Sequence, residues 1–198
     1  QTYILFFPRI GRNRELKKVL EGYWKGELSE GQLRNTALED QHGTGLSFVT
    51  VGDFSFCDFL DLTIALGTVT YIFRNVGSAF DTYFVMTRGD GSRNIPVMEM
   101  TKWLNTKYHY IVLELSSNQT FQPSLEWLEM IAGQLGFHAK PVLPGPITNL
   151  PLSKDKTEVS SGKAYRSLEI YISFLERLTP QCGWIQVDEP ILCTDMAD

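Results

Sequence analysis

The feature that most constrains the fold of this sequence is an alternation of short apolar segments with amphipathic ones. Residues 3–7 form an apolar run closed by Pro8 and Gly11, which is typical of a buried strand in a parallel sheet. From Asn13, a predicted N-cap, apolar residues recur at helical spacing and leave charged residues on the opposite side. These apolar positions are Leu16, Val19, Leu20, Tyr23 and Trp24. The pattern predicts a strand, a turn and an amphipathic helix.

The same order recurs along the rest of the chain. The expected strands are 46–51, 108–115, 140–143 and 184–187, and the expected helices are 57–66, 124–135 and 163–178. Such alternation predicts an α/β fold, with a parallel sheet and crossover helices. Two polar segments, 86–96 and 151–162, are predicted to be long loops, and a short helical stretch is expected between Asn35 and Gly45.

Composition limits the classes of protein to consider. A length of 198 residues predicts one domain, 1–198, and 43% hydrophobic with 21% charged residues is ordinary for a soluble globular protein. The net charge of −5 argues against a nucleic-acid surface, and no window is apolar enough for a membrane helix. Three cysteines without a CxxC pair favour a reducing, cytoplasmic location.

Two cations stand in the first turn of the first predicted helix. Arg14 and Lys17 lie where the helix dipole and free N–H groups favour anions, so a negative partner is expected. They could grip the carboxylates of a ligand. Alternatively, both are solvated side chains, or Arg14 pairs with Glu15 or Asp53.

A pair of carboxylates closes the last predicted strand. Asp188 and Glu189 follow Trp184–Val187, at the strand end where barrel enzymes place reactive groups, and they form a candidate pocket. Alternatively, Asp188 caps a helix that begins at Pro190. Asp53 and Asp58 follow another predicted strand and carry the same two interpretations.

The sequence offers no metal-binding pattern. His109 is expected to be a hydrogen-bonded histidine of the core or rim, and His42 and His138 have no partner at ligand spacing. Cys182 and Cys193 bracket a strand at a separation that no standard zinc pattern uses, so a structural role is favoured.

Five phrases that lie mostly at strand ends together resemble one enzyme family. They are FFPRIGRNRELKK (6–18), VGDFSFCD (51–58), MEMTKWLNTKYHYIV (98–112), KPVLPGP (140–146) and WIQVDEPIL (184–192). In this order they resemble the N-terminal barrel of the cobalamin-independent methionine synthases. The resemblance implies a TIM-type (β/α)8 barrel, of which about five strand–helix units are recognisable here.

The resemblance also implies an activity and binding residues. Family members transfer a methyl group from 5-methyltetrahydropteroyltri-L-glutamate to L-homocysteine, and contact the folate triglutamate through positions matched here by Arg14, Glu15, Leu16, Lys17 and Lys102. Family members use a zinc ion and no cobalamin, and the C-terminal barrel of the same polypeptide holds the zinc. The resemblance therefore implies no catalytic or metal residue in this chain, which is expected to be inactive in isolation.

Some features depart from the family pattern. Phe6 stands where Gly is usual and Leu113 where Pro is usual, and several barrel units are not recognisable. The chain is expected to be either a shortened relative or a piece of a longer protein. The alternative function is a non-catalytic shortened paralogue that serves as a binding or assembly module. A stand-alone barrel methyltransferase of the uroporphyrinogen-decarboxylase-like kind would need its own metal ligands, which the sequence does not offer.

Overall fold

A computed structural model describes residues 2–5, 10–51, 67, 69–115, 138–149, 153–155 and 161–195. Its helices are α1 (Glu15–Trp24), α2 (Glu30–His42), α4 (Ala79–Arg88), α6 (Pro146–Asn149) and α7 (Ser161–Leu178), with 3-10 helices η1 (Tyr71–Phe73) and η2 (Pro190–Cys193). Its strands are β1 (Val49–Val51), β2 (Met100–Lys102), β3 (His109–Ile111), β4 (Glu114–Leu115), β5 (Ala139–Pro144), β6 (Lys154–Asp155) and β7 (Gln186–Asp188). In this part of the chain, no helix is both long and apolar enough to cross a bilayer.

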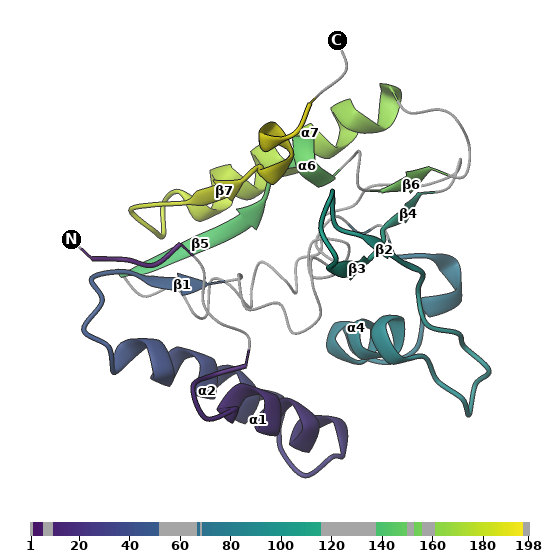
Figure 1. Cartoon of the computed structure of the whole chain (residues 1–198), viewed down its shortest axis with the longest axis horizontal. Helices are drawn as coiled ribbons and strands as arrows, with labels where there is room; N and C mark the ends of the chain where they lie inside the picture. The colour runs from purple at the N-terminus through teal and green to yellow at the C-terminus, as the bar shows by residue number, and fades with distance from the viewer. Residues whose placement is uncertain are drawn as a thin grey trace.

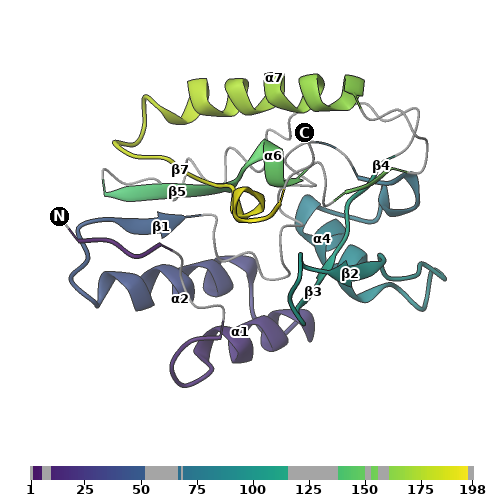
Figure 2. The same cartoon turned by 45° about the horizontal axis from the view of Figure 1, so that its top comes forward.

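The central element is a parallel sheet in the order β1-β5-β7. The middle strand β5 pairs with β1 on one side, where Ala139 lies opposite Val49. It pairs with β7 on the other side, where Val142 lies opposite Gln186. Helix α7 runs alongside β5 and β7 in both views (Figures 1 and 2). One face of the sheet and the apolar side of α7 form a core of Val51, Ala139, Leu143, Ile170, Tyr171, Phe174 and Leu178. Burial of this apolar area holds the helix on the sheet.

The parallel sheet confirms the predicted α/β class. Strands expected at 46–51, 140–143 and 184–187 are present as β1, β5 and β7, and the helix expected at 163–178 is α7. The strands of the described residues form one three-stranded and two two-stranded sheets, and no closed barrel is found among them. The helices predicted at 57–66 and 124–135 lie outside the described residues.

The first predicted strand is wrong where the structure describes it, because Tyr3–Leu5 is not a strand. The Nζ of Lys140 donates a hydrogen bond of 2.8 Å to the carbonyl of Ile4, and the Nε2 of Gln186 donates one of 2.9 Å to that of Leu5. These carbonyls are thus bound by side chains rather than by a neighbouring strand. Residues 6 and 7, including Phe6, lie outside the described residues.

A second core joins the helices of the N-terminal half. Its buried residues are Leu33, Phe73, Val76, Tyr83, Phe84, Val85, Met86 and Met98, and Val19, Leu20 and Tyr23 of α1 and Ile111 of β3 pack against them. Phe84 of α4 lies 5.2 Å from Tyr23 and 5.4 Å from Trp24 between ring centroids. Helix α1, helix α4 and the hairpin that contains β3 therefore belong to one packing unit.

The segment predicted as one strand at 108–115 is divided into two. His109–Ile111 (β3) pairs antiparallel with β2, and Glu114–Leu115 (β4) pairs parallel with β6. Because β6 is Lys154–Asp155, part of the predicted loop 151–162 belongs to a sheet. Lys154 also forms an ion pair with Glu99, which ties this short strand to the residue before β2.

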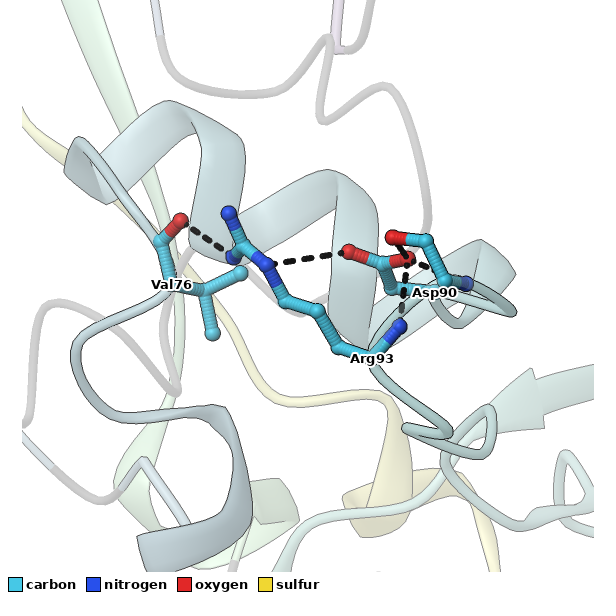
Figure 3. A network of polar contacts seen from close by, with 4 residues as sticks. Val76, Asp90 and Arg93 are labelled. Carbon is cyan, nitrogen blue, oxygen red and sulfur yellow. Dashed lines mark hydrogen bonds and ion pairs between the residues drawn. The ribbon is translucent and has the colours of Figure 1, made fainter.

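The predicted loop 86–96 begins with the end of α4 and continues as a tight turn. Asp90 and Ile95 form an isolated β-bridge, and one carboxylate oxygen of Asp90 accepts hydrogen bonds from the Oγ of Ser92 and the backbone N–H of Arg93. These bonds lower the pKa of Asp90, and the nearby guanidinium of Arg93 adds to the effect. The guanidinium also donates to the carbonyl of Val76 at 2.6 Å, so the turn is fastened to the segment that leads into α4 (Figure 3).

Two helices begin with capping boxes. The Oγ of Ser29 accepts from the backbone N–H of Gln32 while the Gln32 side chain accepts from that of Ser29, and Ser78 and Asp81 do the same at the start of α4. The Ser29–Gln32 box explains why α2 begins at Glu30, before the predicted Asn35. The predicted N-cap of α1 is wrong, because Arg14 occupies that position at φ 66° and makes no side-chain cap.

We predict that Ser29→Ala destabilises the protein by about 1 kcal/mol, because the backbone N–H of Gln32 loses its acceptor and the Gln32 side chain loses the hydroxyl that donates to it. Urea unfolding measures this change in the free energy of unfolding. Ser29→Thr retains a hydroxyl acceptor and is the matched control. Equal stability of the alanine and threonine variants would contradict the prediction.

Candidate functional site

The carboxyl ends of β5 and β7 are locked together. The backbone N–H of Gly145 donates a 2.7 Å hydrogen bond to the carbonyl of Asp188. The carboxylate of Glu189 accepts from the backbone N–H of Ile147 at 2.9 Å and from that of Thr148 at 2.6 Å. These N–H groups at the start of α6 have no partner inside the helix, so an anion is favoured there. The carboxylate of Glu189 thus has a structural role in joining two strand ends.

This lock requires a glycine at position 145. A Cβ at Gly145 would lie 2.0 Å from the Cδ of Glu189, closer than any real contact. Behind it, the hydroxyl of Tyr171 on α7 donates a 2.5 Å hydrogen bond to the carbonyl of Pro144. Burial, and then the nearby charge of Glu189, raise the pKa of Tyr171 far above its ordinary value, so this hydroxyl keeps its proton.

Asp188 does not cap the following helix, so that alternative is wrong. The 3-10 helix begins at Pro190, as predicted, but its N-cap residue is Glu189, which makes no side-chain cap to it. The Oδ1 of Asp188 instead accepts a 2.8 Å hydrogen bond from the Nε2 of Gln186, two residues earlier on β7. Asp188 lines a cavity of about 360 Å³, of which Glu189 is not a lining residue.

A buried lysine lies in the same cavity. Lys140 of β5 is 5% exposed, and its ammonium donates to the carbonyl of Ile4 and to the Oε1 of Gln186, and lies 4.8 Å from the ring centroid of Tyr3. Lys140, Gln186 and Asp188 therefore form one chain of polar contacts across the sheet. Sequence reasoning missed Lys140 and Gln186. The signal was a lysine inside the apolar run Ala139–Leu143, since lysine is almost never fully buried without a partner.

The first turn of α1 contains four of the predicted binding positions. Glu15 folds back, and hydrogen bonds from its own backbone N–H and from that of Asn13 lower the pKa of its carboxyl. Leu16 is 3% exposed, so any ligand contact at this position would come from its backbone. Arg14 and Lys17 are exposed. Arg14 does not pair with Glu15.

The fifth predicted position, Lys102, ends β2 in the antiparallel hairpin. It is exposed and lies opposite His109 in the register. The hairpin is anchored beneath by Tyr110, which is 4% exposed and packs edge-on against Trp103 at 5.3 Å between ring centroids. Burial raises the pKa of Tyr110 to about 12.

No side-chain hydrogen bond or ion pair joins Arg14, Lys17 or Lys102 to any residue that the structure describes. The pKa of the nearby Glu21 carboxyl is lowered mainly by Arg88 and to a smaller extent by the charge of Lys17. The elements that carry them are related by packing, because α1 and β3, the partner strand of β2, contribute to the same core. The two elements thus border the same core, and the three cations stand on exposed positions.

The remaining candidates have unremarkable surroundings. His109 is exposed, with its Nδ1 3.1 Å from the carbonyl of Lys107, which fits the predicted hydrogen-bonded rim histidine. Cys182 and Cys193 are free thiols, and burial raises the pKa of Cys182. Asp53 and Asp58 lie outside the described residues, as does the side chain of His42. Among the described residues, no group of three or more His, Cys, Asp or Glu could hold a metal ion, so this part of the chain does not fit a zinc site.

Fold and site define a class, an α/β domain whose parallel strands end in interlocked Pro-Gly-Pro and Asp-Glu-Pro segments. The whole chain, residues 1–198, matches the family model described as "Cobalamin-independent synthase, N-terminal domain". The chain therefore belongs to the family of cobalamin-independent synthases, as the resemblance of its five phrases indicated.

Curated relatives agree with this assignment. The chain is 42% identical to the 5-methyltetrahydropteroyltriglutamate–homocysteine methyltransferase of Syntrophotalea carbinolica, over 98% of its own length and 28% of the relative's. It is also 41% identical to two proteins of the same name. The match covers 100% of this chain and 27% of the protein from Nitratidesulfovibrio vulgaris, and 98% of this chain and 28% of the protein from Nitrosomonas europaea. The chain thus spans little more than a quarter of the length of these relatives.

We predict that Gly145→Ala destabilises the protein by about 1–3 kcal/mol, because the new methyl group displaces the Glu189 carboxylate from its two N–H donors. Gly183→Ala is the matched control, since no atom lies within 4 Å of a Cβ at that position. Urea unfolding compares the two variants. Equal free energies of unfolding would show that Glu189 does not depend on this glycine.

Proposed function

We propose that this chain is the folate-polyglutamate-binding part of a zinc-dependent methyltransferase that makes methionine from homocysteine and 5-methyltetrahydropteroyltri-L-glutamate. The family assignment and the names of the relatives support this reaction for the longer protein. In it, residues 1–198 form most of an N-terminal (β/α)8 barrel, and a C-terminal barrel of the same cytoplasmic polypeptide supplies zinc and the site of methyl transfer. No cobalamin takes part.

The observation that carries this proposal is the state of three cations. Arg14, Lys17 and Lys102 are exposed, and their side chains form no hydrogen bond or ion pair with the described part of the chain, although the protein as a whole is acidic. A triglutamate tail carries several carboxylates and needs several cations. Side chains that the fold does not already hold in an ion pair are available to form charge-assisted hydrogen bonds with such a tail.

The backbone of the first turn supports the same role. Arg14 adopts a left-handed conformation at φ 66°, which is uncommon for a residue other than glycine. Residues held in such conformations cluster at ligand-binding sites, where the surrounding structure compensates for the strain. The Glu15 carboxylate occupies the Asn13 N–H, and buried Leu16 fixes the turn, so both act as supports for Arg14 and Lys17.

The tail-binding role predicts a loss of affinity that depends on the number of glutamates. Lys17→Ala and Lys102→Ala should each weaken binding of a triglutamyl folate by about 1–3 kcal/mol, and binding of the monoglutamate by less. Isothermal titration calorimetry with both ligands measures the difference. Lys107→Ala is the matched control, because this exposed lysine lies on the same hairpin as Lys102 and is not a predicted contact. Equal losses of binding free energy for both ligands would mean that the lysines do not contact the glutamate tail.

The division of labour predicts that the isolated chain is catalytically silent. The purified 198-residue protein, supplied with both substrates and zinc, should form no methionine, because the metal and the homocysteine site belong to the remaining part of the longer protein. Mass spectrometry of the product and metal analysis of the protein measure this. Methionine formation by a chain with substoichiometric zinc would overturn the proposal. Sequencing the parent transcript beyond Asp198 separates the enzyme from a non-catalytic module, which would end there.

A further inference from the structure

Residues 2–5 cross the parallel sheet as a segment that is not itself a strand. The segment lies beside β1 in both views (Figures 1 and 2). There the carbonyl of Thr2 accepts hydrogen bonds from the backbone N–H groups of Ser47, at 2.9 Å, and Phe48, at 3.2 Å. The Oγ of Ser47 in turn accepts one of 2.9 Å from the backbone N–H of Thr2. One end of this segment, here called the strap, is thus fastened to the start of β1.

The other end of the strap covers the ammonium of Lys140 on β5. The Nζ of Lys140 donates to the carbonyl of Ile4 at 2.8 Å and lies 4.8 Å from the ring centroid of Tyr3. The carbonyl of Leu5 accepts from the Nε2 of Gln186 on β7. Lys140 is 5% exposed, and a buried charge is tolerated only where polar groups replace its water. The strap therefore supplies part of what makes the burial of Lys140 possible.

The strap contributes little to the apolar interior. Tyr3 is 58% exposed and Leu5 is 67% exposed, and no residue of the strap belongs to either apolar core of the described part of the chain. Opening of the strap would therefore uncover little apolar surface. It would also let water reach the ammonium of Lys140, which offsets part of the hydrogen bonding that is lost. Opening should thus cost less free energy than unfolding of the sheet.

The sheet beneath has its own support. Ala139 and Leu143 of β5 belong to the core with α7, and side chains alternate along a strand, so Lys140 points to the opposite face, which the strap crosses. The backbone pairing of β5 with β1 and β7 involves no residue of the strap. Both the core and the pairing can therefore persist when the strap leaves.

We propose that the strap is a movable cover that opens over Lys140 while the sheet stays folded. In the closed state, Tyr3 and Leu5 form part of the wall of the cavity of about 360 Å³ that Asp188 also lines, and the ammonium is covered. In the open state, the cavity loses this wall and gains the ammonium of Lys140 as an exposed cation. The strap thus switches the charge that the cavity presents. This device is independent of the proposed binding of a folate tail.

The test is the reactivity of the Lys140 amine in the 198-residue chain toward N-hydroxysuccinimide acetate, followed by mass spectrometry of its peptides. When acetylation is slow compared with closing, its rate follows the population of the open state. Lys140 should react more slowly than exposed Lys107, but at least about tenfold faster than the global unfolding measured in urea allows. Ser47→Ala removes an acceptor of the strap without touching Lys140, and should raise the rate about fivefold. Ser92→Ala removes a hydrogen-bonding hydroxyl from the turn at Asp90 and is the matched control, with no change expected.

Hydrogen exchange measures the fastened end of the strap independently. The N–H groups of Ser47 and Phe48, which donate to the strap, should exchange faster than that of Val49, which donates to the residue before β5 and is released only when the sheet opens. Equal exchange of the three groups would overturn the proposal. So would acetylation of Lys140 as fast as that of Lys107, acetylation no faster than global unfolding allows, or a rate unchanged in Ser47→Ala.

Discussion

The contact on which the described structure most depends is the seating of the Glu189 carboxylate over Gly145. Parallel strands are paired by evenly spaced hydrogen bonds that do not themselves define where the strands stop. Here the register of β5 and β7 ends at Pro144 and Asp188, and the next residue of each strand completes the lock. The carboxylate neutralises the start of α6, and Tyr171 brings α7 against the same strand end. Sheet, short helix and long helix therefore meet at one point.

Much of the sheet could be predicted because burial leaves a strong pattern. The run Ala139–Pro144 is apolar apart from Lys140, and the amphipathic segment at 163–178 needs a sheet to cover. Helix α2 was harder, because its composition is polar and its side chains present no wide apolar stripe. Its signal was local, in the Ser29–Gln32 spacing of a capping box. The start of α1 at Arg14 could not be predicted, since a left-handed arginine follows from the surrounding turn rather than from its own preference.

The same distinction applies to the candidate site. Strand-end residues such as Asp188 and Glu189 were found because their position in the order of elements is readable. What each does depends on contacts between distant segments: Glu189 with residues 147 and 148, Asp188 with a cavity whose wall includes Tyr3. Such partners are up to 185 positions apart, 188 minus 3, and no local pattern specifies them. The contacts of Lys140 with Ile4 and Gln186 were missed for this reason, although a charged residue inside an apolar strand indicates that a partner exists.

The fold places its cations in two different kinds of surroundings. Lys140 is a cation that the fold has already neutralised, because carbonyls, an amide and an aromatic ring surround it and leave it 5% exposed. Arg14, Lys17 and Lys102 are cations that the described part of the fold leaves to solvent. A buried ammonium cannot serve a mobile, multiply charged tail, since the tail would have to lose its hydration to reach it. Exposed cations can, and they act over a distance of about 8 Å at physiological salt. The division therefore assigns anion capture to the exposed cations rather than to Lys140.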